Sequence, residues 1–231
     1  MRKLFLVGVI LAMPAGSAAA PICVSGTLSD YMALGSDGCT IGGATVSDFA
    51  SSVLLLDATE IVASDVNVIP LSSGIGLDFG VMQSADAADL FDILIRYSLA
   101  GLAINGNSLS MTGSSAAGDG NVTAVEDKCI GGSFAGTDPA APCGGIPVTL
   151  IVAEDAFGLV SPDTETFPSE FASFFDIFTE ITIDGGTSGS AALNGTVRNE
   201  FLPAAVPEPA MILLVGTGLA GFVVRRRRQK H

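Results

Sequence analysis

The strongest constraint on the fold of this chain is a strict alternation of apolar and polar side chains within short segments. Between Phe91 and Leu99 every odd-numbered position carries a large apolar residue, whereas Asp92 and Arg96 occupy even positions. Residues 177–183 alternate in a similar way. Successive side chains of a β-strand point to opposite faces of the sheet. Both segments therefore predict strands that turn one face towards a hydrophobic core.

Glycine content and chain length indicate the kind of β-fold. The sequence has 28 glycines and no tryptophan, and its apolar residues come in short runs rather than helical stripes. Turn signals of the hairpin type occur at Asp184-Gly185-Gly186 and Asn194-Gly195. Only residues 85–90 favour a helical turn. We expect an all-β fold, a single jelly-roll-like β-sandwich over residues 21–203, since about 185 residues suffice for one core. The predicted strands are residues 52–56, 65–69, 75–79, 91–100, 121–126, 147–153, 174–183 and 191–201.

The first twenty residues have the order of a secretory signal peptide. Arg2 and Lys3 form a basic head, residues 4–13 an apolar stretch, and residues 16–20 a run of small residues. This apolar stretch is too short to span a bilayer. We therefore predict a signal peptide at residues 1–20, with cleavage after Ala18 or Ala19.

The other end of the chain combines an apolar run with a basic cluster. Residues 210–224 carry no charge. As a helix they would extend roughly 22 Å, against a hydrocarbon core of roughly 30 Å that can thin locally. We predict a transmembrane helix here, followed by a cytoplasmic stop-transfer cluster that places the intervening domain outside, first in the periplasm. The basic cluster comprises Arg225, Arg226, Arg227, Arg228 and Lys230.

A family resemblance begins with three residues that precede this run. Pro207-Glu208-Pro209, an apolar span and a terminal arginine cluster stand in that order. Together they resemble the PEP-CTERM sorting signal, here residues 204–231. The resemblance implies a partner, exosortase, which is a membrane-embedded cysteine protease or transpeptidase of Gram-negative bacteria that make extracellular polysaccharide. It also implies processing near the three residues and release or reattachment at the cell surface. A plain single-pass anchor is the alternative.

The resemblance extends into the domain between the two ends. Residues 28–49 are similar to the opening of many PEP-CTERM ectodomains, and residues 185–201 are similar to their last hairpin. Those ectodomains share no established activity. The likeness therefore implies a fold and a context, and no chemistry.

Charge limits the partners of the domain. Residues 21–209 hold only Arg96, Lys128 and Arg198 as basic residues, against all 24 acidic residues of the chain, so their formal charge is −21. Nucleic acid and anionic membrane surfaces repel such a domain. Cations, neutral glycans such as extracellular polysaccharide, and basic proteins remain as partners. An acidic surface that only keeps the protein soluble is the simpler alternative.

The four cysteines fit an oxidising compartment. Four cysteines allow three connectivities, and spacing alone does not choose among them. We favour the local pairs Cys23–Cys39 and Cys129–Cys143, whose intervening segments are rich in Gly, Asp, Ser and Pro. Each bridge would close a loop of about 15 residues, worth about 3 kcal/mol. Zinc is disfavoured because there is no CxxC pair and no nearby histidine.

Few residues offer catalytic chemistry. The one histidine is His231, at the end of the chain, which leaves the domain without the imidazole of a Ser-His-Asp or Cys-His site. A pair of carboxylates, as in glycosidases, remains as an alternative. Sugar-cleaving sites commonly line their subsites with aromatic side chains, however, and the domain has only Tyr31 and Tyr97 besides phenylalanines. We therefore expect no enzyme.

No cofactor is expected, and calcium is the alternative. Asp86, Asp89 and Asp92 are weak candidate ligands, because calcium takes carboxylate and carbonyl oxygens. A second acidic group runs from Glu154 to Glu165, and neither group follows the EF-hand pattern. The sequence as a whole predicts an exported surface or exopolysaccharide-matrix protein with a structural, adhesive or glycan-binding domain. A secreted carbohydrate-active hydrolase is the alternative.

Overall fold

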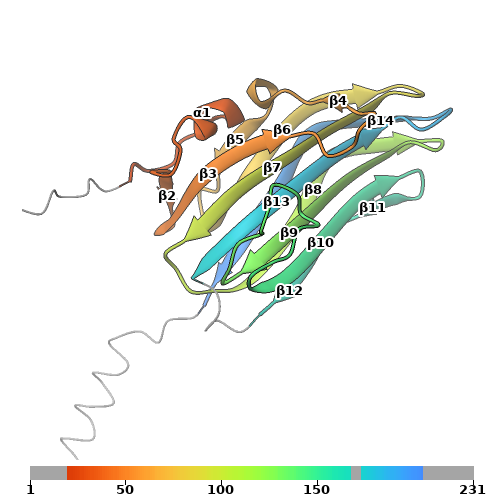
Figure 1. Ribbon diagram of the computed structural model, residues 1–231. Helices are drawn as coiled ribbons and strands as arrows, with labels where there is room; N and C mark the ends of the chain where they lie inside the picture. The colour runs from red at the N-terminus through yellow and green to blue at the C-terminus, as the bar shows by residue number, and fades with distance from the viewer. Residues whose placement is uncertain (1–19, 168–172, 205–231) are drawn as a thin grey trace, which may run out of the picture.

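The domain is a sandwich of two β-sheets stacked face to face (Figure 1). The computed structural model describes residues 20–167 and 173–204. Every strand pair is antiparallel except β4 with β7. The six-stranded sheet has the order β1 (Gly26–Thr27), β5 (Asn67–Pro70), β6 (Ile75–Ala85), β14 (Ser190–Pro203), β8 (Ile104–Ala117), β12 (Asp163–Thr166). The eight-stranded sheet has the order β11 (Gly158–Val160), β10 (Ile146–Asp155), β9 (Asn121–Ile130), β13 (Phe174–Asp184), β7 (Leu90–Ala100), β3 (Ala44–Ser52), β2 (Cys39–Ile41), with β4 (Thr59–Glu60) beside β7.

From β6 to β9, successive strands alternate between the two sheets. Strands β6, β8 and β14 lie in the six-stranded sheet, and β7, β9 and β13 lie in the eight-stranded one. The last two strands enter the middle of each sheet, with β13 between β7 and β9 and β14 between β6 and β8. The C-terminal strands therefore complete both sheets, and the prediction of an all-β sandwich is confirmed.

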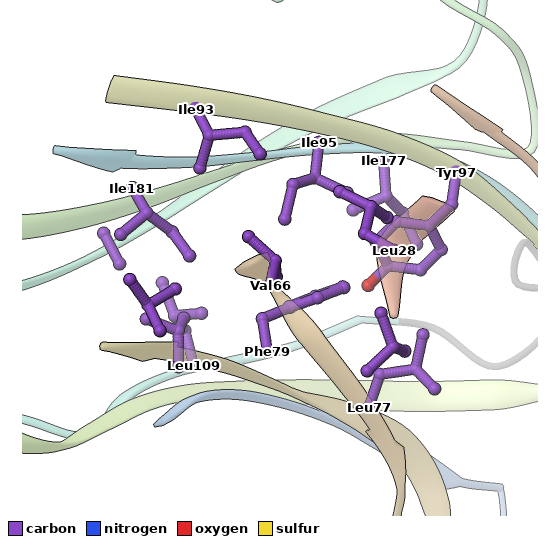
Figure 2. Close-up of a cluster of buried hydrophobic side chains, with 14 of the residues drawn as sticks. Leu28, Val66, Leu77, Phe79, Ile93, Ile95, Tyr97, Leu109, Ile177 and Ile181 are labelled. Atoms are coloured by element: carbon purple, nitrogen blue, oxygen red, sulfur yellow. The ribbon is translucent and has the colours of Figure 1, made fainter. Parts of the chain in front are cut away.

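The core lies between the sheets, where the alternating residues meet. Ile93, Ile95 and Tyr97 of β7 face Leu77 and Phe79 of β6 (Figure 2). All five side chains are almost wholly buried. Burying one large apolar side chain contributes about 1.5–3 kcal/mol, so this layer explains why the alternation in the sequence predicts the strands correctly.

Several local predictions were wrong. Strand β3 ends at Ser52, and residues 53–58 form a loop in place of the predicted strand at 52–56. Residues 86–89 make a tight turn between β6 and β7, closed by a hydrogen bond from Asp89 N to Asp86 O, instead of a helical turn.

Neither glycine signal marks a hairpin. Residues 185–189 connect β13 in one sheet to β14 in the other. Gly195 lies inside β14 at a register shift against β8, where a Cβ atom would stand 2.0 Å from the carbonyl oxygen of Thr112. The glycine therefore serves close backbone approach at a bulge.

One short helix, α1 (Leu28–Met32), and one 3-10 turn, η1 (Ala63–Asp65), complete the described elements. In the part of the chain that the structure describes, no helix is long and apolar enough to cross a membrane. Residues 1–19 of the predicted signal peptide and the whole predicted transmembrane helix lie outside the described residues.

Candidate functional site

Two disulfides join the local cysteine pairs, as predicted. Cys23 is bonded to Cys39, and Cys129 is bonded to Cys143, with Cα–Cα distances of 5.0 Å and 5.5 Å. The first ties the N-terminal segment to β2, and the second closes the loop that follows β9. No cysteine of the described chain is free. Both bridges thus restrict segments outside the regular strands of the sandwich.

The second disulfide holds a loop over the outer face of the eight-stranded sheet. Phe134 from this loop packs edge-on against Phe178 of β13, with ring centroids 5.0 Å apart. The backbone N–H of Phe134 donates to Asp176 at 2.9 Å. Arg96 donates two hydrogen bonds to the same carboxylate, at 3.0 and 2.6 Å, and one to the carbonyl of Gly136 at 2.9 Å. The Cys129–Cys143 disulfide and the Arg96–Asp176 ion pair therefore both hold this loop against the sheet.

A polar cluster lies between the two sheets, where the alternation predicts only apolar contacts. Glu126 and Lys128 extend inward from β9, Asn107 of β8 bonds Lys128, and Asn199 of β14 bonds Asn107. Each of these four side chains is 0% exposed. Lys128 Nζ donates to Glu126 Oε1 at 2.5 Å and also to Asn107 Oδ1. Asn107 Nδ2 donates to Asn199 Oδ1 at 2.5 Å within the six-stranded sheet, and the bond from Lys128 to Asn107 crosses from one sheet to the other.

Burial dominates the electrostatics of this cluster. It raises the pKa of the Glu126 carboxyl, although the charge of Lys128 acts in the opposite direction. Burial also raises the pKa of Tyr97 well above its usual value, and the charge of Glu126 adds to that rise. Tyr97 accepts a hydrogen bond from Asn199 Nδ2 at 2.5 Å. The interior thus disfavours charge on the acidic groups of this network.

This cluster was not predicted, although the sequence holds a signal for it. In β9, Val122, Ala124 and Ile130 share the parity of Glu126 and Lys128, and all five are buried. Extending the predicted strand of residues 121–126 by four residues would have placed both charges on the core face.

Each basic residue of the domain has an acidic partner. Arg96 pairs with Asp176, Lys128 with Glu126, and Arg198 with Asp78, at 2.6, 2.5 and 2.8 Å. The remaining acidic residues therefore set the sign of the surface charge.

The structure separates the candidate calcium ligands. Asp92 is buried in β7, where its carboxylate accepts hydrogen bonds from Leu54 N, Leu55 N and the Thr182 hydroxyl. Asp86 and Asp89 lie exposed in the turn before β7. Within residues 20–167 and 173–204, no group of three His, Cys, Asp or Glu side chains is arranged to hold a metal ion.

The second acidic group also serves local structure. Asp163 accepts a hydrogen bond from Ile151 N at 2.8 Å, and Asp155 accepts one from Phe157 N at 2.7 Å. These carboxylates therefore stabilise the strand edge and the turn around β10 and β11.

A small hollow lies beside the first disulfide. It has a volume of about 310 Å³, and its lining includes Ile22, Val24, Tyr31 and Asp30. Asp30, its one acidic residue, accepts hydrogen bonds from the N–H and hydroxyl of Thr27 at the start of α1. These bonds hold the pKa of Asp30 below its usual value. The one carboxylate in this hollow therefore already caps helix α1.

Comparison with known proteins gives one match at the level of sequence and one at the level of structure. No curated protein matches this sequence. The solved structure of TmCBM61 in complex with beta-1,4-galactotriose is 10% identical, with a TM-score of 0.29, over 65% of this chain and 86% of that chain. Overlap this low carries no argument about function.

The sequence match falls at the C-terminal end. Strand β14 ends at Pro203, and the matched segment begins two residues later, outside the described residues. It contains Pro207, Glu208 and Pro209 together with the apolar run and the arginines. Residues 205–228 match the PEP-CTERM protein-sorting motif, so this chain carries the sorting signal that its C-terminal sequence indicates.

Proposed function

We propose that this is an exported protein, sorted and processed by exosortase, whose β-sandwich is a non-catalytic structural module at the cell surface or in an exopolysaccharide matrix. The observation that carries the proposal is the sorting motif at residues 205–228. The last strand pair in the fold joins Pro203 to Ile104. Processing at residues 207–209 therefore removes no residue of either sheet, and the module keeps its fold after release.

The disulfides support the exported location. Both bridges are formed, and the described chain holds no free cysteine, as suits a periplasmic or extracellular protein. Cleavage of the signal peptide after Ala18 or Ala19 and a membrane helix at residues 210–224 remain predictions. The strand orders β6-β14-β8-β12 and β7-β13-β9-β10 support a jelly-roll form of the sandwich.

A structural role is favoured over an enzymatic one because the buried carboxylates Asp92 and Asp176 bind donors of the fold itself. Asp92 and Asp176 are each saturated with donors from loops and neighbouring strands. They hold the fold together, whereas a glycosidase needs a pair of carboxyls free to meet a substrate.

Sugar binding is less well supported than a structural role. Both tyrosines are buried, Tyr31 at 3% and Tyr97 at 0% exposure, so neither offers a face on which a sugar ring could stack. Phe157, in the turn between β10 and β11, is the large aromatic side chain that the described surface presents. A binding site for extracellular polysaccharide would have to rest mainly on polar loops.

The intact mass of the mature protein, purified from its own host, tests the proposal. We expect a C-terminus between Pro207 and Pro209, with residues 210–231 removed, and an N-terminus just after Ala18 or Ala19. Glu208→Ala should leave a chain that ends at His231. Glu165→Ala, which changes an exposed acid of β12, is the matched control and should be processed normally. A wild-type chain that keeps His231 would make the tail a permanent anchor and overturn the proposal.

A further inference from the structure

The buried cluster brings an amine, a carboxyl and a carboxamide into contact in a place without access to solvent. Lys128 Nζ bonds both Glu126 Oε1, at 2.5 Å, and Asn107 Oδ1. Lys128 and Glu126 leave β9 on the same face, and Asn107 comes from β8 in the opposite sheet. The three side chains are 0% exposed. An amine in contact with an amide carbonyl, beside a carboxyl that can carry protons, is an arrangement for acyl transfer.

An ordinary ion pair explains this cluster poorly. Lys128 is the only lysine of residues 21–209, and it occupies a wholly buried site. Two charges in such a site cost more than apolar residues of the same size would. Glu126 Oε2 has no hydrogen-bond partner within the described residues. Burial raises the pKa of Glu126, and a proton passed from Lys128 to this carboxyl leaves an uncharged amine, which is the nucleophilic form.

We propose that Lys128 and Asn107 react to form an intramolecular amide bond, with Glu126 as the proton carrier. The lone pair of Nζ attacks Cγ of Asn107, and Glu126 accepts a proton from the attacking nitrogen. Glu126 then returns a proton to Nδ2, the Cγ–Nδ2 bond breaks, and ammonia leaves. One C–N bond forms and one breaks, nothing is oxidised or reduced, and no other reactant is required.

The position of the bond gives it a mechanical role. Residues 107 and 128 are 21 positions apart, so the bond closes a loop that contains the turn between β8 and β9. It also ties the two sheets together across the core. Cys129, the next residue of β9, forms its disulfide on the outer face of the same sheet. Strand β9 is then covalently held on both faces, and the inner bond resists reduction.

The test is the mass of the mature chain purified from its host, after reduction of the disulfides, followed by digestion with trypsin under denaturing conditions. We expect a mass lower by one ammonia than that of the sequence between its observed termini. Cleavage after Lys128 should fail, because its amine is acylated, so residues 97–198 should appear as one fragment. A chain at the sequence mass, cut into residues 97–128 and 129–198, would overturn the proposal.

Two variants separate the reaction from its surroundings. Glu126→Gln keeps the volume of the side chain and removes the proton carrier, so the ammonia should be retained. Lys128→Arg keeps the positive charge without the nucleophile, and trypsin should then cut after position 128. Loss of the bond should lower the unfolding temperature by about 5–10 °C. Loss of ammonia in Glu126→Gln would refute the role of Glu126, and the wild-type mass decides the bond itself even if a variant fails to fold.

Discussion

The two faces of the eight-stranded sheet each carry an ion pair, and the two pairs lie in opposite surroundings. On the inner face, Lys128 and Glu126 are both 0% exposed. On the outer face, Asp176 is nearly buried, but the Arg96 side chain keeps 27% of its surface in contact with solvent. Each pair is also bonded to a residue outside this sheet. Lys128 bonds Asn107 of the other sheet, and Arg96 bonds Gly136 of the loop that follows β9.

The difference shows how burial changes the hydrogen bonds that a charged pair needs. Arg96 satisfies its donors with Asp176 and the Gly136 carbonyl, and its guanidinium lies 5.1 Å from the centre of the Phe178 ring. The inner pair is 0% exposed and relies on Asn107 and the amide groups bonded to it. On the outer face the pair adds stability to a loop, whereas on the inner face any polar atom left without a partner lowers the stability of the fold.

The largest effect is expected from removing half of the inner pair. Lys128→Met keeps most of the side-chain volume but leaves Glu126 buried without its cation, and it should lower the free energy of unfolding by about 3–5 kcal/mol. The double variant Glu126→Leu/Lys128→Met removes both charges and should lose much less. Urea unfolding followed by circular dichroism measures both.

This pair of variants separates charge from covalent bonding. Neither can form a bond between positions 107 and 128, so that loss is common to both. Equal destabilisation of the single and double variants would show that the uncompensated carboxylate is not the main cost, and that the inner pair differs less from the outer one than its burial implies.

A smaller effect is expected on the outer face. Arg96→Met removes two hydrogen bonds from Asp176, which is 1% exposed and keeps the bond from Phe134 N, and should cost about 1–3 kcal/mol. The matched control is Arg198→Met on the six-stranded sheet, where the arginine side chain is 46% exposed and the cost should be about 0–1 kcal/mol.

Proteolysis completes the test of the outer pair. In Arg96→Met the loop of residues 131–145 should be cut faster by a protease of broad specificity, since the bond to Gly136 is lost. Arg198→Met should leave the loop protected. Equal protection in both variants would mean that the Cys129–Cys143 bridge alone holds the loop.

The sequence predicts the strands that alternate and misses those that do not. Strand β7 and β13 were predicted almost to the residue because their core faces are large and apolar. Strand β8, with 14 residues one of the two longest described, was not predicted. Its serines, glycines and asparagines carry no such pattern, and its place depends on pairing with β14 and β12. Tertiary pairing therefore outweighs local preference there.

The functional and structural sites also differ in how far the sequence predicts them. The sorting motif is a linear signal, read in order along residues 205–228, so the sequence alone predicted it. The disulfide pairing was also predicted correctly, because both pairs are local. The inner cluster joins residues 107, 126 and 199, which only the stacking of the two sheets brings together. The loop position on the outer face likewise depends on Arg96 and Asp176, 80 residues apart.

The smallest expected effect on stability at neutral pH comes from the two tyrosines. They compare the core, where Tyr97 lies, with the N-terminal hollow, where Tyr31 lies. Burial raises the pKa of Tyr31, near the N-terminal hollow, to about 12, and raises that of Tyr97 in the core well above its usual value. Unfolded tyrosine loses its proton near a pH of about 10. Stability is therefore fully present below that pH and falls as the pH rises towards 12, because the unfolded chain loses protons first.

Tyrosinate absorbance during an alkaline titration measures this directly, since the chain has two tyrosines and no tryptophan. The folded protein should show no tyrosinate near a pH of about 10, whereas the chain in urea should titrate both groups there. Tyr31→Phe should remove the step near pH 12 and leave Tyr97, which should ionise only as the sandwich unfolds. Ionisation of Tyr97 in the folded chain would mean that water reaches the inner face, and the contrast between the two faces would then fail.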